Sequence, residues 1–186
     1  MINRYSLCFQ PDDATIEIVR QMKLQLAGHI GWYNSKNSLA HMTISKFQTD
    51  SMGVNKIAQL VRQQCSTFTP TQVLFNDYGQ YPNGAFFLAV DKEDQVMLKE
   101  YAKKVMSKVS LPDVYKSNEP HMSIARKLEP IKLQQALVFF EKPAISFMCD
   151  KVALRQFNPE RRQYDIIDIF PFLGMPSNEA EQLSLF

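Results

Sequence analysis

The chain is poor in the residues that mark secreted, disulfide-bonded and membrane-spanning proteins. Its 186 residues include only three cysteines, six glycines and one tryptophan. The cysteines are odd in number, lie far apart and form no Cys-x-x-Cys pair, so we expect reduced thiols rather than a disulfide framework. No stretch approaches the roughly 20 apolar residues that cross a bilayer, and the segment up to Arg20 lacks the apolar core of a secretion signal. We therefore expect a cytoplasmic protein that does not contact membranes.

The chain also lacks a strong excess of charge of either sign. Its 21 lysines and arginines nearly balance 19 acidic residues, which leaves a net charge of +2 at pH 7. Such a balance argues against the basic coat of a protein that binds long nucleic acids over its whole surface, although a local patch or a small phosphate ligand fits it. The 45% hydrophobic content is enough for one domain, or for two small lobes that share a cleft.

Two near-identical tetrapeptides stand out against this ordinary composition. Residues 41–44 read His-Met-Thr-Ile and residues 121–124 read His-Met-Ser-Ile, and together they hold two of the three histidines. Side chains at positions i and i+2 of a strand share a face, so each motif presents an imidazole beside a hydroxyl. Two such strands brought together would offer two imidazoles and two hydroxyls, which suits acid–base chemistry on a phosphodiester.

The elements around the two motifs are predicted to repeat. Each half runs strand, helix, histidine-bearing strand, helix, strand, which favours a duplication with a pseudo-twofold axis. We predict one domain over residues 1–175, with interleaved lobes and duplicated halves of about 1–80 and 84–173, followed by a flexible tail at 176–186. Besides the motifs, strands are predicted at 5–9, 71–78, 85–90, 145–148, 152–157 and 164–170, and helices around 16–26, 54–65, 98–109 and 133–140.

With one motif in each half, the chain resembles the 2H phosphoesterase superfamily, and within it the bacterial 2′-5′ RNA ligase or RNA 2′,3′-cyclic phosphodiesterase group. Residues 41–47 are similar to that group's HxTLxF run and residues 121–126 to its HxTLAR run. Ser123 replaces the commoner threonine and keeps the hydroxyl, and isoleucine replaces leucine in both motifs. The resemblance implies an α+β bilobal fold, with two pseudo-symmetric lobes of mainly antiparallel sheet and outer helices around a central cleft.

The resemblance also implies a function. It suggests an RNA-processing enzyme without metal or other cofactor, acting on RNA ends or small nucleotides that carry a 2′,3′-cyclic phosphate. His41 and His121 would exchange protons with the reactants, while Thr43 and Ser123 would hydrogen-bond the phosphate oxygens. Run in reverse, the same site would join ends through a 2′-5′ linkage.

Other interpretations of the motifs remain open. The histidines and hydroxyls would be simple structural pairs in a protein that only binds RNA ends or nucleotides. A zinc site is disfavoured, because neither motif supplies a third histidine, cysteine or carboxylate.

Three further residues are candidates for substrate binding. Phe47 lies six positions after His41, so it shares that face if the strand runs on, and it would then stack on a base; a place in the core is the alternative. Arg126 matches the family's arginine, but strand alternation puts it opposite His121 unless the strand bends or ends. Strand alternation sets Lys127 on the same face as His121, but Lys127 matches the family's pattern less well than Arg126 does. Both cations are candidates for phosphate binding.

The last residues carry a second resemblance. Gln182, Leu183, Ser184, Leu185 and Phe186 look like the peptide with which bacterial proteins dock on the replicative sliding clamp, and a polar linker precedes them. This sequence raises the hypothesis of an adaptor recruited to the clamp. The alternative is that the three apolar residues fold back on their own domain. Apart from such a partner we expect a monomer.

Deleting residues 182–186 is expected to leave the melting temperature and phosphodiesterase activity almost unchanged, because the predicted strands end by Phe170. A synthetic peptide of the last residues should bind a bacterial sliding clamp with a Kd on the order of micromolar in a fluorescence polarisation assay. The peptide with Leu185→Ala and Phe186→Ala should not bind. If the truncated protein melts several degrees lower and the peptide binds no clamp, the tail belongs to the protein's own core.

Overall fold

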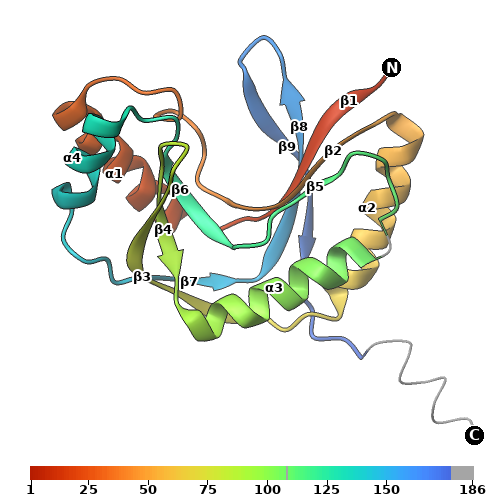
Figure 1. The fold of residues 1–186 in the computed structure, drawn as a ribbon. Helices are drawn as coiled ribbons and strands as arrows, with labels where there is room; N and C mark the ends of the chain where they lie inside the picture. Colours follow the sequence, from red (N-terminus) through yellow and green to blue (C-terminus); the bar gives the residue numbers. More distant parts are fainter. Residues whose placement is uncertain (108, 177–186) are drawn as a thin grey trace, which may run out of the picture.

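The computed structural model describes residues 1–107 and 109–176, which form four helices and nine strands (Figure 1). The predicted α+β class with a mainly antiparallel sheet is confirmed, and every predicted helix and strand is present, although the third helix starts at Lys92, earlier than predicted. The helices are α1 (Asp13–Ile30), α2 (Ser51–Ser66), α3 (Lys92–Ser107) and α4 (Pro130–Phe139). The strands are β1 (Asn3–Phe9), β2 (Met42–Thr49), β3 (Thr71–Tyr81), β4 (Ala85–Val90), β5 (Tyr115–Lys116), β6 (His121–Ala125), β7 (Ile145–Cys149), β8 (Lys151–Asn158) and β9 (Gln163–Pro171).

All nine strands join one curled antiparallel sheet in the order β7-β3-β4-β6-β2-β1-β8-β9, with short β5 beside β2. The two motif-bearing strands, β6 and β2, lie at its centre and meet at a single pair, Met42 opposite Met122. On either side the sheet bends away into two arms (Figure 1). We call β7-β3-β4-β6 arm A and β2-β1-β8-β9 arm B.

The arms do not coincide with the two halves of the sequence. Strand β3 comes from the first half, but it pairs with β4 and β7 in arm A. Strands β8 and β9 come from the second half, but they extend the sheet from β1 in arm B. Each arm therefore combines chain from both halves.

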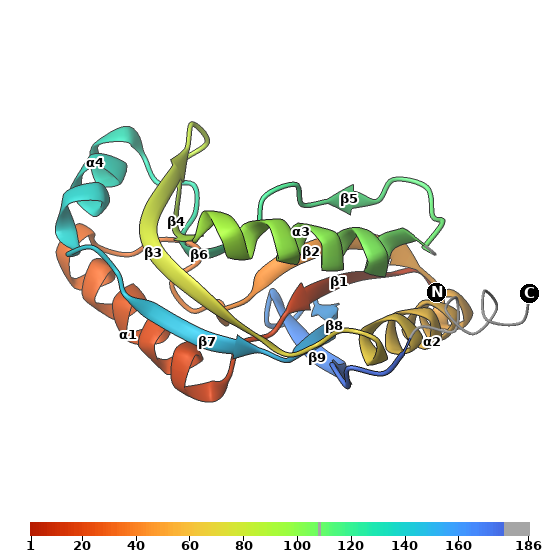
Figure 2. The same cartoon turned by 90° about the horizontal axis from the view of Figure 1, so that it is seen from below.

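The helices tie the two arms together. Helix α1 connects two strands of arm B, yet it packs against β6, β7 and α4. Helix α3 follows β4 of arm A and leads to β5, which pairs with β2 of arm B, and it packs against both β3 and α2. Seen from below, α1 and α4 lie at one end of the molecule and α2 at the other, with α3 running between them (Figure 2). Because each arm is covered partly by a helix from the other, we expect the two arms to fold together.

Local signals explain where the first helix begins and ends. The Asp12 carboxylate caps α1 by accepting a hydrogen bond of 2.7 Å from the Thr15 amide. The helix continues to Ile30 and ends at Gly31, whose φ of 79° suits glycine. Buried apolar side chains at helical spacing hold α1 on the sheet: Val19, Met22, Leu26 and Ile30.

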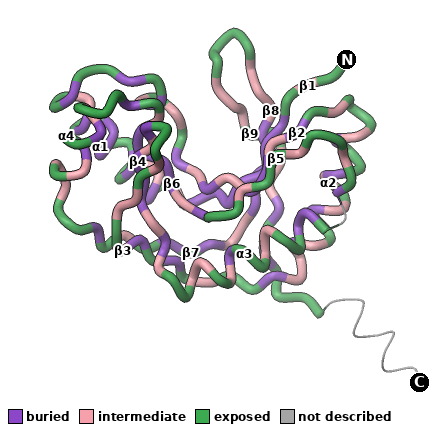
Figure 3. The backbone as a smooth tube through the Cα atoms, viewed as in Figure 1, coloured by how far each residue is buried: buried purple, intermediate pink, exposed green. Residues whose placement is uncertain are grey.

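Buried residues run along the strands of both arms (Figure 3). Two of the cysteines, Cys8 and Cys149, are on these strands and Cys65 is on α2, and all three are buried free thiols. None of the helices in the described part of the chain is long and apolar enough to span a bilayer. The predicted docking residues Gln182, Leu183, Leu185 and Phe186 lie outside the described residues.

Candidate active site

The four predicted catalytic residues lie where the two motif-bearing strands meet. Met42 and Met122 pair across the strands and are fully buried, at 0% exposure each. Antiparallel register then sets His41 beside Ser123 and Thr43 beside His121, on the face opposite to the methionines. The structure therefore brings two imidazoles and two hydroxyls to one point of the sheet.

Both imidazoles are oriented by the same hydrogen bond. Nδ1 of His41 donates to the carbonyl oxygen of Leu39 over 2.7 Å, and Nδ1 of His121 donates to that of Glu119 over 2.8 Å. A carbonyl oxygen can only accept, so each neutral ring carries its proton on Nδ1. The lone pair of each neutral ring is then on Nε2, the atom left free for a reactant.

A buried lysine holds the loop before His41 through hydrogen bonds. Lys23 on α1 is 1% exposed, and its Nζ donates to the carbonyl oxygen of Ser38 over 2.6 Å and to the Ser38 hydroxyl over 3.0 Å. Burial lowers the pKa of Lys23 to about 8. The next carbonyl in that loop is that of Leu39, so Lys23 fixes the segment that orients the His41 ring.

Aromatic side chains hold the second ring. The Phe87 ring centroid lies 4.5 Å from that of His121, and the Tyr81 ring meets it edge-on at 5.5 Å. The Tyr81 hydroxyl donates to the carboxylate of Glu119 over 2.7 Å, two residues before His121. These contacts restrain the orientation of the imidazole.

Burial and nearby cations keep both imidazoles neutral in the free protein. Desolvation, with help from the Arg155 guanidinium, lowers the pKa of His41 well below its usual value of 6.5. Desolvation also lowers the pKa of His121, but there the Glu119 carbonyl and carboxylate oppose the shift. A lowered histidine pKa means that the neutral form dominates at pH 7, and His121 holds a proton more readily than His41.

Each motif contains an extra residue that interrupts the strand ladder at the same place. Ile44 has no partner on β1, since Leu7 pairs with Ser45 and Cys8 pairs with Thr43. Ile124 likewise has none on β4, since Phe86 pairs with Ala125 and Phe87 pairs with Ser123. An inserted residue of this kind is a β-bulge, and it reverses the alternation of every side chain that follows.

The two bulges bring a cation to the histidine face in each motif. Lys46 pairs with Ser6, which shares a face with Cys8 and thus with Thr43. Arg126 reaches the same face in its motif, where its Nε donates to the Ser123 hydroxyl over 3.3 Å. Strand alternation was expected to set Arg126 opposite His121 unless the strand bends or ends, and this condition is met, because β6 has a bulge at Ile124 and ends at Ala125.

The bulge at Ile44 also explains why Phe47 does not lie on the face of His41, where it would stack on a base. Its ring is 3% exposed and stacks on Tyr5 with the centroids 5.8 Å apart, so it lies in the core and not on the face of His41. Lys127 is exposed, with a left-handed φ of 55° just past the strand. Lys46 and Arg155 were not predicted; for Lys46 the available signal was a basic residue five positions after each histidine.

A cavity of about 400 Å³ opens beside His41. It is strongly basic, and it also contains two aromatic rings from the β8–β9 hairpin, Phe157 and Tyr164. His121, Thr43 and Ser123 do not line it, so the cavity extends from the His41 side of the motif pair. Its cations are Lys46, Arg126, Lys127, Arg155 and Arg162.

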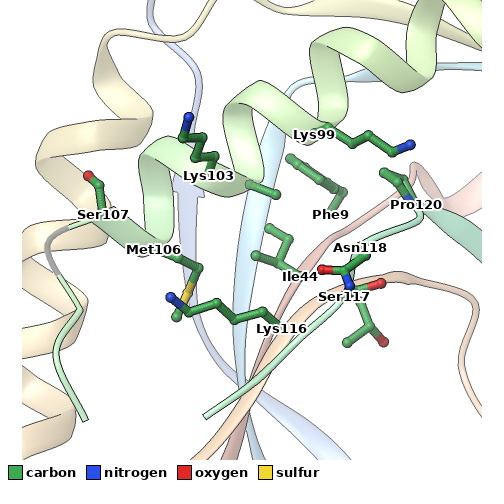
Figure 4. A pocket seen from close by; sticks show the side chains of 12 residues that line it. Phe9, Ile44, Lys99, Lys103, Met106, Ser107, Lys116, Ser117, Asn118 and Pro120 are labelled. Carbon is green, nitrogen blue, oxygen red and sulfur yellow. The ribbon is translucent and has the colours of Figure 1, made fainter.

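A second cavity, of about 430 Å³, lies between α3 and strands β1 and β2 (Figure 4). Phe9, Ile44 and Met106 line it with apolar atoms, and three lysines from α3 and β5 also line it. It includes Thr43 but neither histidine. The part of the chain that the structure describes has no group of three or more His, Cys, Asp or Glu side chains suited to a metal ion.

Solved structures share this fold at low sequence identity. Escherichia coli LigT complexed with 3′-AMP matches with a TM-score of 0.67 and 13% identity over 92% of this chain and 99% of LigT. TT0787 of Thermus thermophilus matches with a TM-score of 0.66 and 15% identity over 93% of this chain and 100% of TT0787. Usb1 of Kluyveromyces marxianus matches with a TM-score of 0.61 and 11% identity over 91% of this chain and 98% of the Usb1 chain. No curated protein sequence matches the chain significantly.

The sequence itself identifies the family. The family model described as the 2′-5′ RNA ligase superfamily matches residues 11–160, a span that includes both motifs, both bulges and Arg155. A match over most of the chain agrees with the fold shared by the solved structures and with the paired motifs. The chain therefore belongs to the 2′-5′ RNA ligase superfamily of 2H phosphoesterases.

Proposed function

We propose that this protein is a metal-independent phosphodiesterase that opens 2′,3′-cyclic phosphates at RNA ends or on small nucleotides. Family and fold support phosphoesterase or 2′-5′ RNA ligase-like activity in general. The observation that carries the finer proposal is the pair of imidazoles at the Met42–Met122 contact, each with Nδ1 bound to a carbonyl and Nε2 free. Two free Nε2 atoms beside two hydroxyls supply an acid, a base and donors to the phosphate.

In the hydrolytic direction, the oxygen of a water molecule attacks phosphorus while one Nε2 lone pair takes the water proton. The bond from phosphorus to one ribose oxygen breaks, and the second imidazole gives that oxygen its proton. The hydroxyls of Thr43 and Ser123 donate to the non-bridging oxygens as negative charge grows there. With a free 5′-hydroxyl in place of water as the nucleophile, the same proton transfers open the 2′,3′-cyclic phosphate at its 3′ oxygen and leave a 2′-5′ linkage.

The unequal environments of the imidazoles assign their roles. His41 has the lower pKa, because the Arg155 guanidinium adds repulsion to the cost of burial. His121 has the Glu119 carboxylate nearby, which favours its protonated form. We therefore assign His41 as the base and His121 as the acid for hydrolysis.

The alternative is a binding module without turnover. LigT, which shares the fold, has been crystallised with 3′-AMP, a nucleoside monophosphate, and that likeness alone is compatible with binding only. The restrained rings favour an enzyme, because binding a phosphate does not require two imidazoles with the same fixed tautomer. A turnover assay on a nucleoside 2′,3′-cyclic phosphate separates the two functions.

Replacing either histidine with alanine should reduce kcat by about 100-fold or more, because each removes one proton-transfer group. The fold should persist, since neither histidine belongs to the hydrophobic core cluster. Steady-state kinetics on a nucleoside 2′,3′-cyclic phosphate, with a melting curve for each variant, provide the check. The exposed His29 on α1, replaced in the same way, is the matched control and should keep full activity.

The same assay tests the absence of a metal requirement. Dialysis against EDTA is expected to leave kcat unchanged. Loss of activity that a divalent ion restores would replace the two-histidine mechanism with a metal-dependent one.

Removing one hydroxyl should have a smaller effect than removing a histidine, because proton transfer survives. Thr43→Val or Ser123→Ala is expected to lower kcat by about 10- to 1,000-fold, the upper end being typical of a dedicated oxyanion donor. Arg126 donates to the Ser123 hydroxyl, so Ser123→Ala also tests whether that contact holds Arg126 in place. Unchanged kcat and KM in both variants would show that the hydroxyls serve only strand packing.

The pH dependence follows from the two lowered pKa values. Turnover needs His41 neutral and His121 protonated. The neutral fraction of His41 increases as pH rises through the pKa of His41, and the protonated fraction of His121 is lost as pH rises through the pKa of His121. Because both pKa values lie below 6.5, kcat/KM should be highest on the acidic side of pH 6.5 and should decline toward pH 8. An NMR titration of the imidazoles checks the order, and a higher pKa for His41 would exchange the two roles.

A further inference from the structure

Arg155 on β8 is a buried cation with no matching anion among the residues that the structure describes. It is 3% exposed, one terminal nitrogen donates to the Ser6 hydroxyl over 3.0 Å, and none of these residues forms a hydrogen bond with its Nε. Within the described ranges, no carboxylate forms an ion pair with it. Burying an unpaired guanidinium is costly, and arginine is suited to bind phosphate through its fork of N–H groups. In the proposed mechanism Arg155 gives no proton and binds no reacting atom; it acts only through its charge, which lowers the pKa of His41.

Arg155 belongs to a row of polar side chains across three neighbouring strands. Ser6 on β1 pairs with Arg155 on one side and with Lys46 on the other, so all three share a face. Arg126 approaches from the second motif, and its charge and that of Arg155 add to burial in lowering the pKa of Lys46. Three cations thus repel one another around one cavity, an arrangement that an anion would relieve.

This row is separate from the place of the reacting phosphate. Thr43 pairs with Cys8, whereas Lys46 pairs with Ser6, two residues further along β1. Two residues of strand span about 7 Å. The hydrogen bond to Ser6 holds the Arg155 guanidinium in its own row.

The cavity above the row also has aromatic walls. The Arg155 guanidinium lies 5.4 Å from the centroid of the Tyr164 ring, and Tyr164 pairs with Phe157 across the β8–β9 hairpin. Arg162, in the turn of that hairpin, adds another cation to the cavity lining. Cations next to partly exposed aromatic rings match a nucleotide unit, with its phosphate on the cations and its base or sugar on the rings.

We propose that Arg155 and Lys46 form a second anion subsite, which binds a phosphate of the substrate other than the one that reacts. The inference rests on the proposed function, and it narrows the substrate class to chain ends that carry a further phosphate on the 5′ side of the terminal nucleoside. A nucleoside 2′,3′-cyclic monophosphate would leave the subsite empty. An oligonucleotide end, or a 5′-phosphorylated nucleoside cyclic phosphate, would fill it.

Calorimetric titration tests the subsite without turnover. The wild-type protein should bind adenosine 3′,5′-bisphosphate about tenfold more tightly than adenosine 3′-monophosphate, the gain expected from a charge-assisted contact to the second phosphate. Arg155→Met should reduce that ratio to within about twofold, while adenosine 3′-monophosphate keeps its affinity. Arg62→Met is the matched control, because it removes the same charge from exposed α2, where Arg62 pairs with Asp168, and it should leave the ratio unchanged.

Lys46→Met provides a second variant, and it decides the matter if Arg155→Met does not fold in a melting experiment. An equal affinity of the wild-type protein for the two ligands would overturn the proposal. So would a variant that weakens both ligands by the same factor, since Arg155 would then act on the reacting phosphate. Failure of the proposed function is distinguishable: no turnover on any cyclic phosphate, together with an intact bisphosphate preference, refutes the enzyme and leaves the subsite.

Discussion

The contact between Met42 and Met122 is the constraint on which the rest of the site depends. It is the point where the two arms of the sheet meet through their motif-bearing strands, and both side chains are fully buried. Because strand side chains alternate with a period of two, a slip of one residue would turn both imidazoles toward the core. An apolar pair with no chemistry of its own therefore determines which polar side chains face the reactants.

The bulges at Ile44 and Ile124 are the second device, and they act at equivalent positions in both halves. Each inserted residue gives up regular pairing with the neighbouring strand, and in return it moves the fifth residue after the histidine onto the histidine face. Without the bulge, Lys46 and Arg126 would point into the apolar layers where Phe47 now packs. Its presence in both halves agrees with the duplication that the sequence indicates.

Local sequence patterns were enough to predict the helices, most strands and the four residues of the two motifs, because periodicity and the repeated motif are properties of short segments. Strand alternation failed beyond Ile44, since a bulge has no signature in side-chain order alone, and Phe47 was misplaced for that reason. The pairing of β3 with β4 in arm A, and the position of Arg155 beside Ser6, depend on contacts between distant segments of the chain. No local pattern marks Arg155, which becomes notable only when its buried Nε is seen without a partner.

The charges of the site couple binding to protonation. In the free protein, burial and the cations around His41 and His121 lower both pKa values, so neither imidazole readily carries the proton that the leaving oxygen needs. A phosphate anion opposes the repulsion from those cations, because a negative charge nearby favours the protonated imidazole. Its arrival also offsets the repulsion among Lys46, Arg126 and Arg155. The substrate thus supplies the charge that prepares the acid, and a ligand without that charge would leave both imidazoles neutral.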